Sequence, residues 1–147
     1  MAVNIKSRQF LHKRVVVDAS VLLKFFLGEE GGIVVGELLQ MNMKGEVSLF
    51  ATSLILFEVL NAVSRSYTNS SDVYIAYGKF KELNIGFIDP DDKYVEQAID
   101  DVFENKKLSY YDVSYHALAR DMDAVFLTAD KRYYNAMKNR GRMVLFA

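Results

Sequence analysis

Three consecutive valines, followed directly by Asp18, constrain the fold of this chain more than any other stretch. Valine is β-branched and favours strands, and because no polar residue interrupts the run, we expect a strand covered on both faces, as in a parallel sheet. A helical apolar pattern begins at Val21, so Asp18 lies where a buried strand gives way to a helix. Ligands bind at this edge of open α/β sheets. The alternative is that Asp18 or Ser20 only caps the helix.

The composition is that of an ordinary globular domain. Of the 147 residues, 51% are hydrophobic and 25% are charged, which is enough for one substantial core. We therefore expect residues 1–147 to form a single domain. The chain carries 18 basic and 19 acidic residues, for a net charge of -1, so its charge alone does not indicate a nucleic-acid-binding protein.

The sequence also favours one cellular compartment. Cysteine is absent, which excludes disulfides and thiolate metal sites and is typical of a reducing environment. No apolar run approaches the roughly 20 residues that span a bilayer, and the amino-terminal segment lacks the apolar core of a signal peptide. These features predict a soluble, cytoplasmic protein without a membrane partner.

Strand and helix patterns alternate along the chain. Strands are expected at residues 14–17, 47–51, 85–88, 124–128 and 143–146. Helices are expected at residues 21–27, 33–43, 54–67, 71–83, 90–103, 110–120 and 131–139. This alternation is typical of an α/β fold in which a central parallel sheet of about five strands has helices on both faces.

Residues 1–13 are mixed in character and weakly basic. Because chain termini order poorly unless they are tied down, we expect a loosely attached amino-terminal arm. A short extra strand through Val3 and Ile5, or a tail that touches phosphates, are the alternatives.

The acidic residues around the chain's one proline are assigned to the start of a helix. Asp89 is the expected N-cap, Pro90 the first helical residue, and Asp91 and Asp92 the acids of the first turn. We therefore expect capping rather than chemistry from this cluster.

Glu58 is an isolated acid in a helix whose beginning is apolar nearly all round. With Asn61 and Arg65 it forms a narrow polar line at helical spacing. This line is either a solvated stripe or the side of the helix that faces a cleft.

Two further aspartates stand where helices begin. Asp112 has capping-box spacing from Ser109, which is one explanation for it, and His116 lies one turn further on the same face. We assign no metal role to His116, because a lone helical histidine is more often a packed or surface residue. Asp130 follows a buried strand, as Asp18 does.

The order of the strands would bring these acids together. If strands two and three lie on one side of strand one and strands four and five on the other, the chain reverses direction between strands one and four, where ligands bind. Asp18 and Asp130 end these two strands, and Glu58 and Asp112 lie on helices that can lean over the same edge. Four carboxylates suit Mg²⁺ or Mn²⁺, which would also neutralise their repulsion. Two such ions roughly 3.5–4 Å apart can activate a water and stabilise the leaving oxygen in phosphodiester hydrolysis.

Over about residues 14–146 the chain resembles the PIN-domain family, and in particular its VapC-type ribonuclease toxins. The motifs that carry the resemblance are Val-Val-Asp18-Ala-Ser20, Glu58-Val-Leu-Asn61-Ala, Tyr-Asp112-Val-Ser-Tyr-His-Ala-Leu-Ala and Leu-Thr128-Ala-Asp130. The resemblance implies a three-layer α/β sandwich. The metal-binding and catalytic acids that it implies are Asp18, Glu58, Asp112 and Asp130, and the supporting polar residues are Ser20, Asn61 and Thr128.

The resemblance also implies a function. It points to an Mg²⁺- or Mn²⁺-dependent endoribonuclease that leaves 5′-phosphate and 3′-hydroxyl ends, and to the toxin of a toxin–antitoxin pair. A homodimer, and an antitoxin that blocks the cleft, are further expectations of the resemblance. The alternative is a catalytically silent PIN-like module that binds RNA or a protein.

The charge that remains once the four acids are set aside is compatible with RNA. Removing 4 from 19 acids leaves 15 against 18 basic residues, a balance of +3. The basic side chains expected nearest the site, as candidate RNA contacts, are Arg65, Lys131 and Arg132. Four tyrosines would either stack on bases or, more in keeping with their spacing, pack in the core or in a subunit interface: Tyr110, Tyr111, Tyr133 and Tyr134.

Overall fold

The computed structural model describes residues 5–146. This part of the chain contains five strands: β1 (Arg14–Val17), β2 (Ser48–Thr52), β3 (Gly86–Ile88), β4 (Val125–Thr128) and β5 (Met143–Leu145). Its seven α-helices are α1 (Ala19–Phe26), α2 (Gly32–Met43), α3 (Ile55–Ser66), α4 (Ser70–Glu82), α5 (Asp92–Glu104), α6 (Tyr110–Asp121) and α7 (Lys131–Met137). Two short 3₁₀ helices are η1 (Ser7–Phe10) and η2 (Lys138–Arg140).

The five strands form one parallel sheet in the order β3-β2-β1-β4-β5. Val16 at the centre of β1 is in register with Phe50 of β2 and Phe126 of β4. Strands β2 and β3 therefore lie on one side of β1, and β4 and β5 on the other, which confirms the predicted strand order. The reversal of chain direction falls between β1 and β4.

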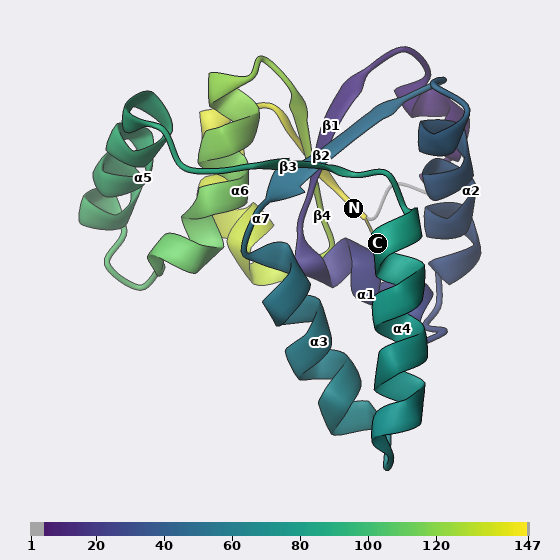
Figure 1. Cartoon of the computed structure of the whole chain (residues 1–147). Helices are drawn as coiled ribbons and strands as arrows, with labels where there is room; N and C mark the ends of the chain where they lie inside the picture. Colours follow the sequence, from purple (N-terminus) through teal and green to yellow (C-terminus); the bar gives the residue numbers. More distant parts are fainter. Residues whose placement is uncertain (1–4, 147) are drawn as a thin grey trace.

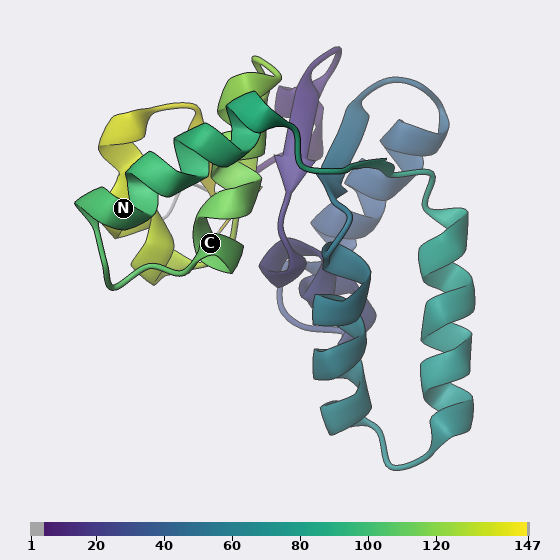
Figure 2. The ribbon, with the colours of Figure 1, turned by 60° about the vertical axis from the view of Figure 1, so that its left-hand side comes forward.

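Helices cover both faces of the sheet (Figure 1). Helix α6 lies against one face and α5 lies outside it, whereas α1 and α2 lie on the opposite face. The three-layer α/β architecture predicted from the sequence is thus confirmed. Helices α3 and α4 form a hairpin that extends beyond the sheet, as Figures 1 and 2 both show.

Burial explains the sequence of the two central elements. Val15, Val16 and Val17 of β1 are all at most 1% exposed, because helices cover both faces of this strand. The stretch from Val113 to Ala119 in α6 is buried without interruption, since α6 lies between the sheet and α5. Strand β1 and helix α6 therefore form the interior from which the functional side chains project.

The expectation of a loose amino-terminal arm is wrong for residues 5–13. Ile5 and Phe10 are buried in the core, with Phe10 only 1% exposed. The Ser7 hydroxyl donates a hydrogen bond to Glu37 of α2 over 2.8 Å, and the backbone N–H of His12 donates to the carbonyl of Glu46 over 2.7 Å. Two apolar side chains thus tie the segment down. Val3, which the alternative of an extra strand involved, lies outside the described residues.

The predicted start of α5 is wrong by two residues. Asp91, not Asp89, is the N-cap, because its carboxylate accepts a hydrogen bond from the backbone N–H of Tyr94 over 2.9 Å. Pro90 therefore precedes the helix. This start places Tyr94 and Ala98 on the buried face. Within residues 5–146, no helix has the length and apolar character needed to cross a membrane.

Replacing Phe10 by alanine tests whether the amino-terminal segment is part of the core. We expect Phe10→Ala to lower the free energy of unfolding by about 3–5 kcal/mol, because it leaves a cavity in a packed interior. Urea denaturation would measure the change. Phe103→Ala is the matched control, since Phe103 is 66% exposed and its loss should have a much smaller effect. Equal effects of the two substitutions would contradict the packing of residues 5–13.

Candidate functional site

One cavity opens at the edge of the sheet where β1 and β4 end. The four acids predicted from the sequence all contribute to it, from the starts of α1, α3, α6 and α7. The complete lining is Asp18, Ala19, Ser20, Glu58, Tyr111, Asp112, Tyr115, Asp130 and Tyr133. The structure therefore brings together side chains that are up to 115 positions apart in the sequence.

Asp18 is both a helix cap and a wall of the cavity. Its Oδ1 accepts hydrogen bonds from the backbone N–H of Val21 over 3.2 Å and from the Ser20 hydroxyl. Its Oδ2 accepts a hydrogen bond from the Thr128 hydroxyl over 2.5 Å. Burial raises the pKa of Asp18 to about 6, against the opposite effect of these hydrogen bonds. The two interpretations of Asp18 are thus compatible rather than exclusive.

Two hydroxyl groups join β1 to β4 through Asp18. Ser20, which donates to Asp18, accepts a hydrogen bond from the backbone N–H of Ala129 over 2.9 Å. Thr128, which also donates to Asp18, accepts from the backbone N–H of Asp130 over 3.0 Å. Both residues were predicted as supporting polar groups, and both hold the Asp18 carboxylate in place.

Asp130 and Asp112 also have capping roles. Asp130 caps α7 by accepting from the backbone N–H of Tyr133 over 3.0 Å. Asp112 forms the predicted capping box with Ser109, with reciprocal hydrogen bonds of 3.0 and 3.1 Å. Its Oδ2 also lies 3.5 Å from the guanidinium of Arg132. Capping therefore fixes both carboxylates at helix starts while they line the cavity.

Glu58 is held differently from the other acids. Its Oε1 accepts a hydrogen bond over 2.7 Å from the hydroxyl of Tyr115, which is 3% exposed and projects from α6. Burial raises the pKa of Glu58, and the hydrogen bond from Tyr115 acts in the opposite direction. Burial, and then the charge of Glu58, raise the pKa of Tyr115 far above its usual value, so the hydroxyl remains a donor.

Sequence reasoning missed Tyr115 as a site residue. The available signal was its position three residues after Asp112, on the same face of α6. The hydroxyl of Thr52, at the end of β2, lies close enough to Tyr115 to affect its pKa. This hydroxyl is buried and makes no hydrogen bond of normal geometry within the described residues.

The other predicted polar residues lie outside the cavity lining. Asn61 and Arg65 are exposed on α3, further along the helix than Glu58. Lys131 and Arg132 are exposed at the start of α7, directly after Asp130. Arg132 contacts Asp112 at the margin of the cavity, whereas Asn61 and Arg65 do not line the cavity.

The four tyrosines differ in how far they are exposed. Tyr133 is 2% exposed and packs in the core, so the base-stacking alternative is wrong for this residue. Tyr134 is partly buried. Tyr110 and Tyr111 are 48% and 62% exposed, and Tyr111 is part of the cavity lining.

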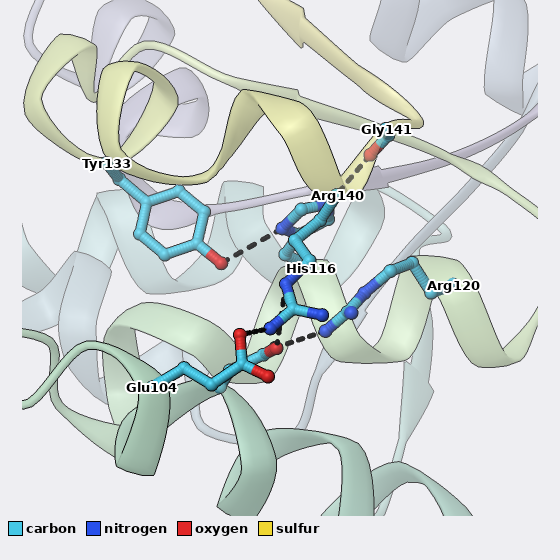
Figure 3. Close-up of polar contacts among 7 residues, drawn as sticks. Glu104, His116, Arg120, Tyr133, Arg140 and Gly141 are labelled. Atoms are coloured by element: carbon cyan, nitrogen blue, oxygen red, sulfur yellow. Dashed lines mark hydrogen bonds and ion pairs between the residues drawn. The ribbon is translucent and has the colours of Figure 1, made fainter.

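His116 is fully buried, and both of its ring nitrogens have partners (Figure 3). Nε2 lies 2.8 Å from the carbonyl oxygen of Gly141, and Nδ1 lies 3.0 Å from the hydroxyl of Tyr133. Because a carbonyl only accepts, Nε2 carries the proton and Nδ1 accepts from Tyr133. Burial lowers the pKa of His116 to about 4. His116 is therefore a packed histidine that joins α6 to α7.

A cluster of charges beside His116 joins α5, α6 and η2 (Figure 3). Asp101 is 1% exposed and forms ion pairs with Arg120 and with Arg140, whose Nε lies 3.7 Å from Oδ1. Arg140 also pairs with Glu104. None of these residues lines the carboxylate cavity. Two acids and two arginines thus neutralise one another in a cluster that is buried at Asp101 and exposed at Glu104.

The donor chemistry of the cavity fits a hard divalent cation. Its walls offer four carboxylates and the hydroxyl of Ser20, and oxygen ligands of this kind suit Mg²⁺ and Mn²⁺. No three acidic, histidine or cysteine side chains among residues 5–146 converge tightly enough to hold one ion as they stand. Asp18, Glu58, Asp112 and Asp130 instead accept hydrogen bonds from protein donors. Ion binding would therefore require these side chains to converge more closely than they do in this structure.

A sequence model of the PIN domain matches residues 15–139. The chain belongs to the PIN domain family. No curated protein matches the sequence significantly. The matched segment contains all four acids that line the cavity.

Solved structures share the PIN fold of this chain. VapC20 from Mycobacterium tuberculosis, described as a sarcin–ricin loop cleaving toxin, is similar with a TM-score of 0.60 at 14% identity, over 83% of this chain and 94% of its own. PAE2754 from Pyrobaculum aerophilum gives 0.63 at 20% identity over 91% of each chain. A toxin–antitoxin complex from Klebsiella pneumoniae gives 0.64 at 12% identity, over 90% of this chain and 98% of the other. At these identities the likeness shows the shared fold.

The lowered pKa of His116 predicts a loss of stability in acid. The folded protein protonates His116 only near pH 4, whereas the unfolded chain does so near 6.5, so the unfolded state binds more protons between these values. The contribution of His116 is therefore complete above pH 6.5 and is lost as the pH falls towards 4. The loss should be on the order of 3 kcal/mol, from a pKa difference of about 2.5.

The matched control for this prediction is His116→Gln, which cannot titrate but keeps a donor and an acceptor. Comparing the free energies of unfolding of the two proteins at each pH cancels the titration of every other group, including Asp18. The free energy of unfolding of the wild type should exceed that of His116→Gln by less at pH 4 than at pH 7. A difference between the two proteins that stays constant over this range would contradict a buried, neutral His116.

Proposed function

We propose that this PIN domain is a metal-dependent endoribonuclease that hydrolyses RNA phosphodiester bonds, and that it is the toxin of a toxin–antitoxin pair. The observation that carries the proposal is the meeting of four carboxylates, from four different helix starts, in one cavity at the edge of the sheet. The fold shared with VapC20, which is described as a sarcin–ricin loop cleaving toxin, supports a nuclease activity of this kind.

The residues proposed to bind Mg²⁺ or Mn²⁺ are Asp18, Glu58, Asp112 and Asp130. When bound, a divalent cation in such a site supplies a more acidic water and positive charge for the leaving oxygen. The protein contributes four carboxylates that project from the starts of four helices. Asp18 accepts hydrogen bonds from two hydroxyls and one backbone N–H, so its orientation is defined before an ion binds.

Burial makes Asp18 the acid whose charge most needs compensation. A carboxylate that is 9% exposed loses most of its hydration, which raises its pKa to about 6. The nearby charge of Asp130 acts in the same direction. A divalent cation beside Asp18 would restore the charged form and remove this repulsion, which is a physical reason for the protein to bind one.

Features around the cavity suit an RNA strand. Lys131 and Arg132 lie beside Asp130 and can contact phosphates, and Arg65 on α3 can extend this contact. Tyr111, exposed at the cavity, can stack on a base, which is a common contact of proteins with single strands. The proposed substrate is therefore an unpaired or structured RNA segment whose phosphate enters the cavity.

The proposed partners are an antitoxin that covers the cavity and a second copy of the chain. The shared fold with a component of the Klebsiella pneumoniae toxin–antitoxin complex supports the first of these. We propose that the protein acts in the cytoplasm, where its RNA substrates are.

Asp18→Asn separates capping from catalysis. Asparagine caps a helix as well as aspartate does, and the hydroxyl hydrogen bond that its amide nitrogen cannot accept is offset by the removal of a buried charge, so the free energy of unfolding should change little. Cleavage of a pool of structured RNAs in the presence of Mn²⁺ should fall by at least two orders of magnitude, as expected when a metal-binding group is lost. Chelation of Mn²⁺ should abolish cleavage by the wild type.

Asp91→Asn is the matched control, because Asp91 is the N-cap of α5 and does not line the cavity. This variant should cleave RNA as the wild type does. Full activity of Asp18→Asn would exclude the proposed role of Asp18. A wild type that binds RNA and does not cleave it at any Mn²⁺ or Mg²⁺ concentration would instead indicate a silent RNA-binding module.

A further inference from the structure

We infer that Tyr115 is a positioning residue that holds Glu58 in the wall of the proposed cation site. The inference rests on the proposed function and deepens it, since it assigns a role in ion binding to a tyrosine that is not itself one of the four acids. Its basis is one contact, a 2.7 Å hydrogen bond from the Tyr115 hydroxyl to Oε1 of Glu58.

Glu58 has less support from the backbone than the other acids. Asp18 and Asp130 are N-caps and Asp112 belongs to a capping box, so backbone N–H groups fix each of these carboxylates. Glu58 lies within the first turn of α3, and its longer side chain has one more rotatable bond. Among the described residues, its hydrogen-bond donor is Tyr115. Loss of that donor would release the carboxylate.

Tyr115 can orient the Glu58 carboxylate because its own ring is fixed by packing. It lies in the middle of the buried stretch of α6, and its side chain is 3% exposed. Its ring lies almost parallel to that of Phe126 in β4, with an interplanar angle of 3° and a centroid distance of 6.4 Å. The ring is thus fixed by the central sheet, and the hydroxyl reaches the cavity from a rigid position.

The contact also links two parts of the fold. Helix α3 begins beside the sheet and runs into the hairpin with α4, which projects away from the core (Figure 2). The Tyr115–Glu58 hydrogen bond joins the start of this helix to the central layer. Because the bond uses Oε1, Oε2 is left to face an ion. A single donor therefore orients Glu58 without occupying both of its oxygens.

The test is the affinity for Mn²⁺ of Tyr115→Phe, which removes the hydroxyl and keeps the ring. The rise of the melting temperature with Mn²⁺ concentration, fitted to the logarithmic dependence of stability on ligand concentration, gives the dissociation constant for Mn²⁺. We expect this dissociation constant to rise on the order of tenfold, as when other groups that orient metal ligands are removed. RNA cleavage should be lost at low Mn²⁺ and recover at saturating Mn²⁺, because the ion then binds in spite of the misplaced Glu58.

Two comparisons separate positioning from a general loss of packing. Tyr94→Phe is the matched control, since Tyr94 is a buried tyrosine, 3% exposed, on α5 and outside the cavity lining. It should leave the dissociation constant for Mn²⁺ unchanged. In a Glu58→Gln background, adding Tyr115→Phe should weaken Mn²⁺ binding no further, because the group that Tyr115 positions is already absent.

The outcomes distinguish this inference from the proposed function. If Glu58→Gln weakens Mn²⁺ binding and Tyr115→Phe does not, the inference is wrong and the proposed function stands. If Glu58→Gln has no effect on Mn²⁺ binding or on RNA cleavage, the proposed cation site itself is wrong at Glu58, and the inference fails with it. Equal effects of Tyr115→Phe in the two backgrounds would show a role in packing only, which also overturns the inference.

A measurement on the wild type covers the case in which Tyr115→Phe does not fold. Tyrosine labelled with ¹³C at the ring carbon that bears the hydroxyl reports on the hydrogen bond of each tyrosine by NMR. Titration with Mg²⁺, which is diamagnetic, should shift the signal of Tyr115 and leave that of Tyr94 unchanged. A Tyr115 signal that does not respond to saturating Mg²⁺ would contradict the inference.

Discussion

The structure depends on the junction between β1 and β4 at Asp18. A parallel sheet that reverses its winding order here leaves a crevice between the two strands, because no helix crosses from one to the next. The Asp18 carboxylate closes the base of this crevice by accepting hydrogen bonds from Ser20 and Thr128. These hydroxyls in turn accept from backbone N–H groups after β4. The negative charge of Asp18 therefore lies at the junction between β1 and β4, where the two halves of the sheet meet.

Helix α6 connects this junction to the rest of the molecule. It is buried from Val113 to Ala119, so its polar side chains must find partners within the protein. Tyr115 directs its hydroxyl to Glu58 at the cavity, whereas His116 bonds Tyr133 of α7 and Gly141 before β5. The same helix therefore fixes the positions of groups on α3 and α7. A substitution in α6 is expected to affect stability and the cavity together.

Local sequence patterns predicted the parts of the fold that local forces determine. The buried valines indicated the central strand, and the strand-end positions of Asp18 and Asp130 indicated the sheet edge. Capping a helix and lining the cavity do not exclude one another for these aspartates, because a carboxylate at a helix start can cap through one oxygen and face a cavity with the other. This explains why Asp112 satisfies a capping box and still lines the cavity.

What the sequence could not predict are contacts between distant residues. Phe10 is apolar but lies in a weakly basic segment, and only its packing in the core shows that residues 5–13 are tied down. The sequence alone indicates only that Tyr115 is a packed aromatic residue. Its hydrogen bond to Glu58 joins residues 57 positions apart. The start of α5 was placed too early because Asp89 and Asp91 are equally good caps, and the burial of Tyr94 decides between them.

The central claim is that the four carboxylates form a cation site, and a crystal structure with Mn²⁺ tests it most directly. Anomalous scattering locates Mn²⁺ without assumptions about the protein. The account predicts a peak in the cavity, within direct coordination distance of carboxylate oxygens that include one of Asp18. A cavity without such a peak at saturating Mn²⁺, in crystals of protein that cleaves RNA, would contradict it.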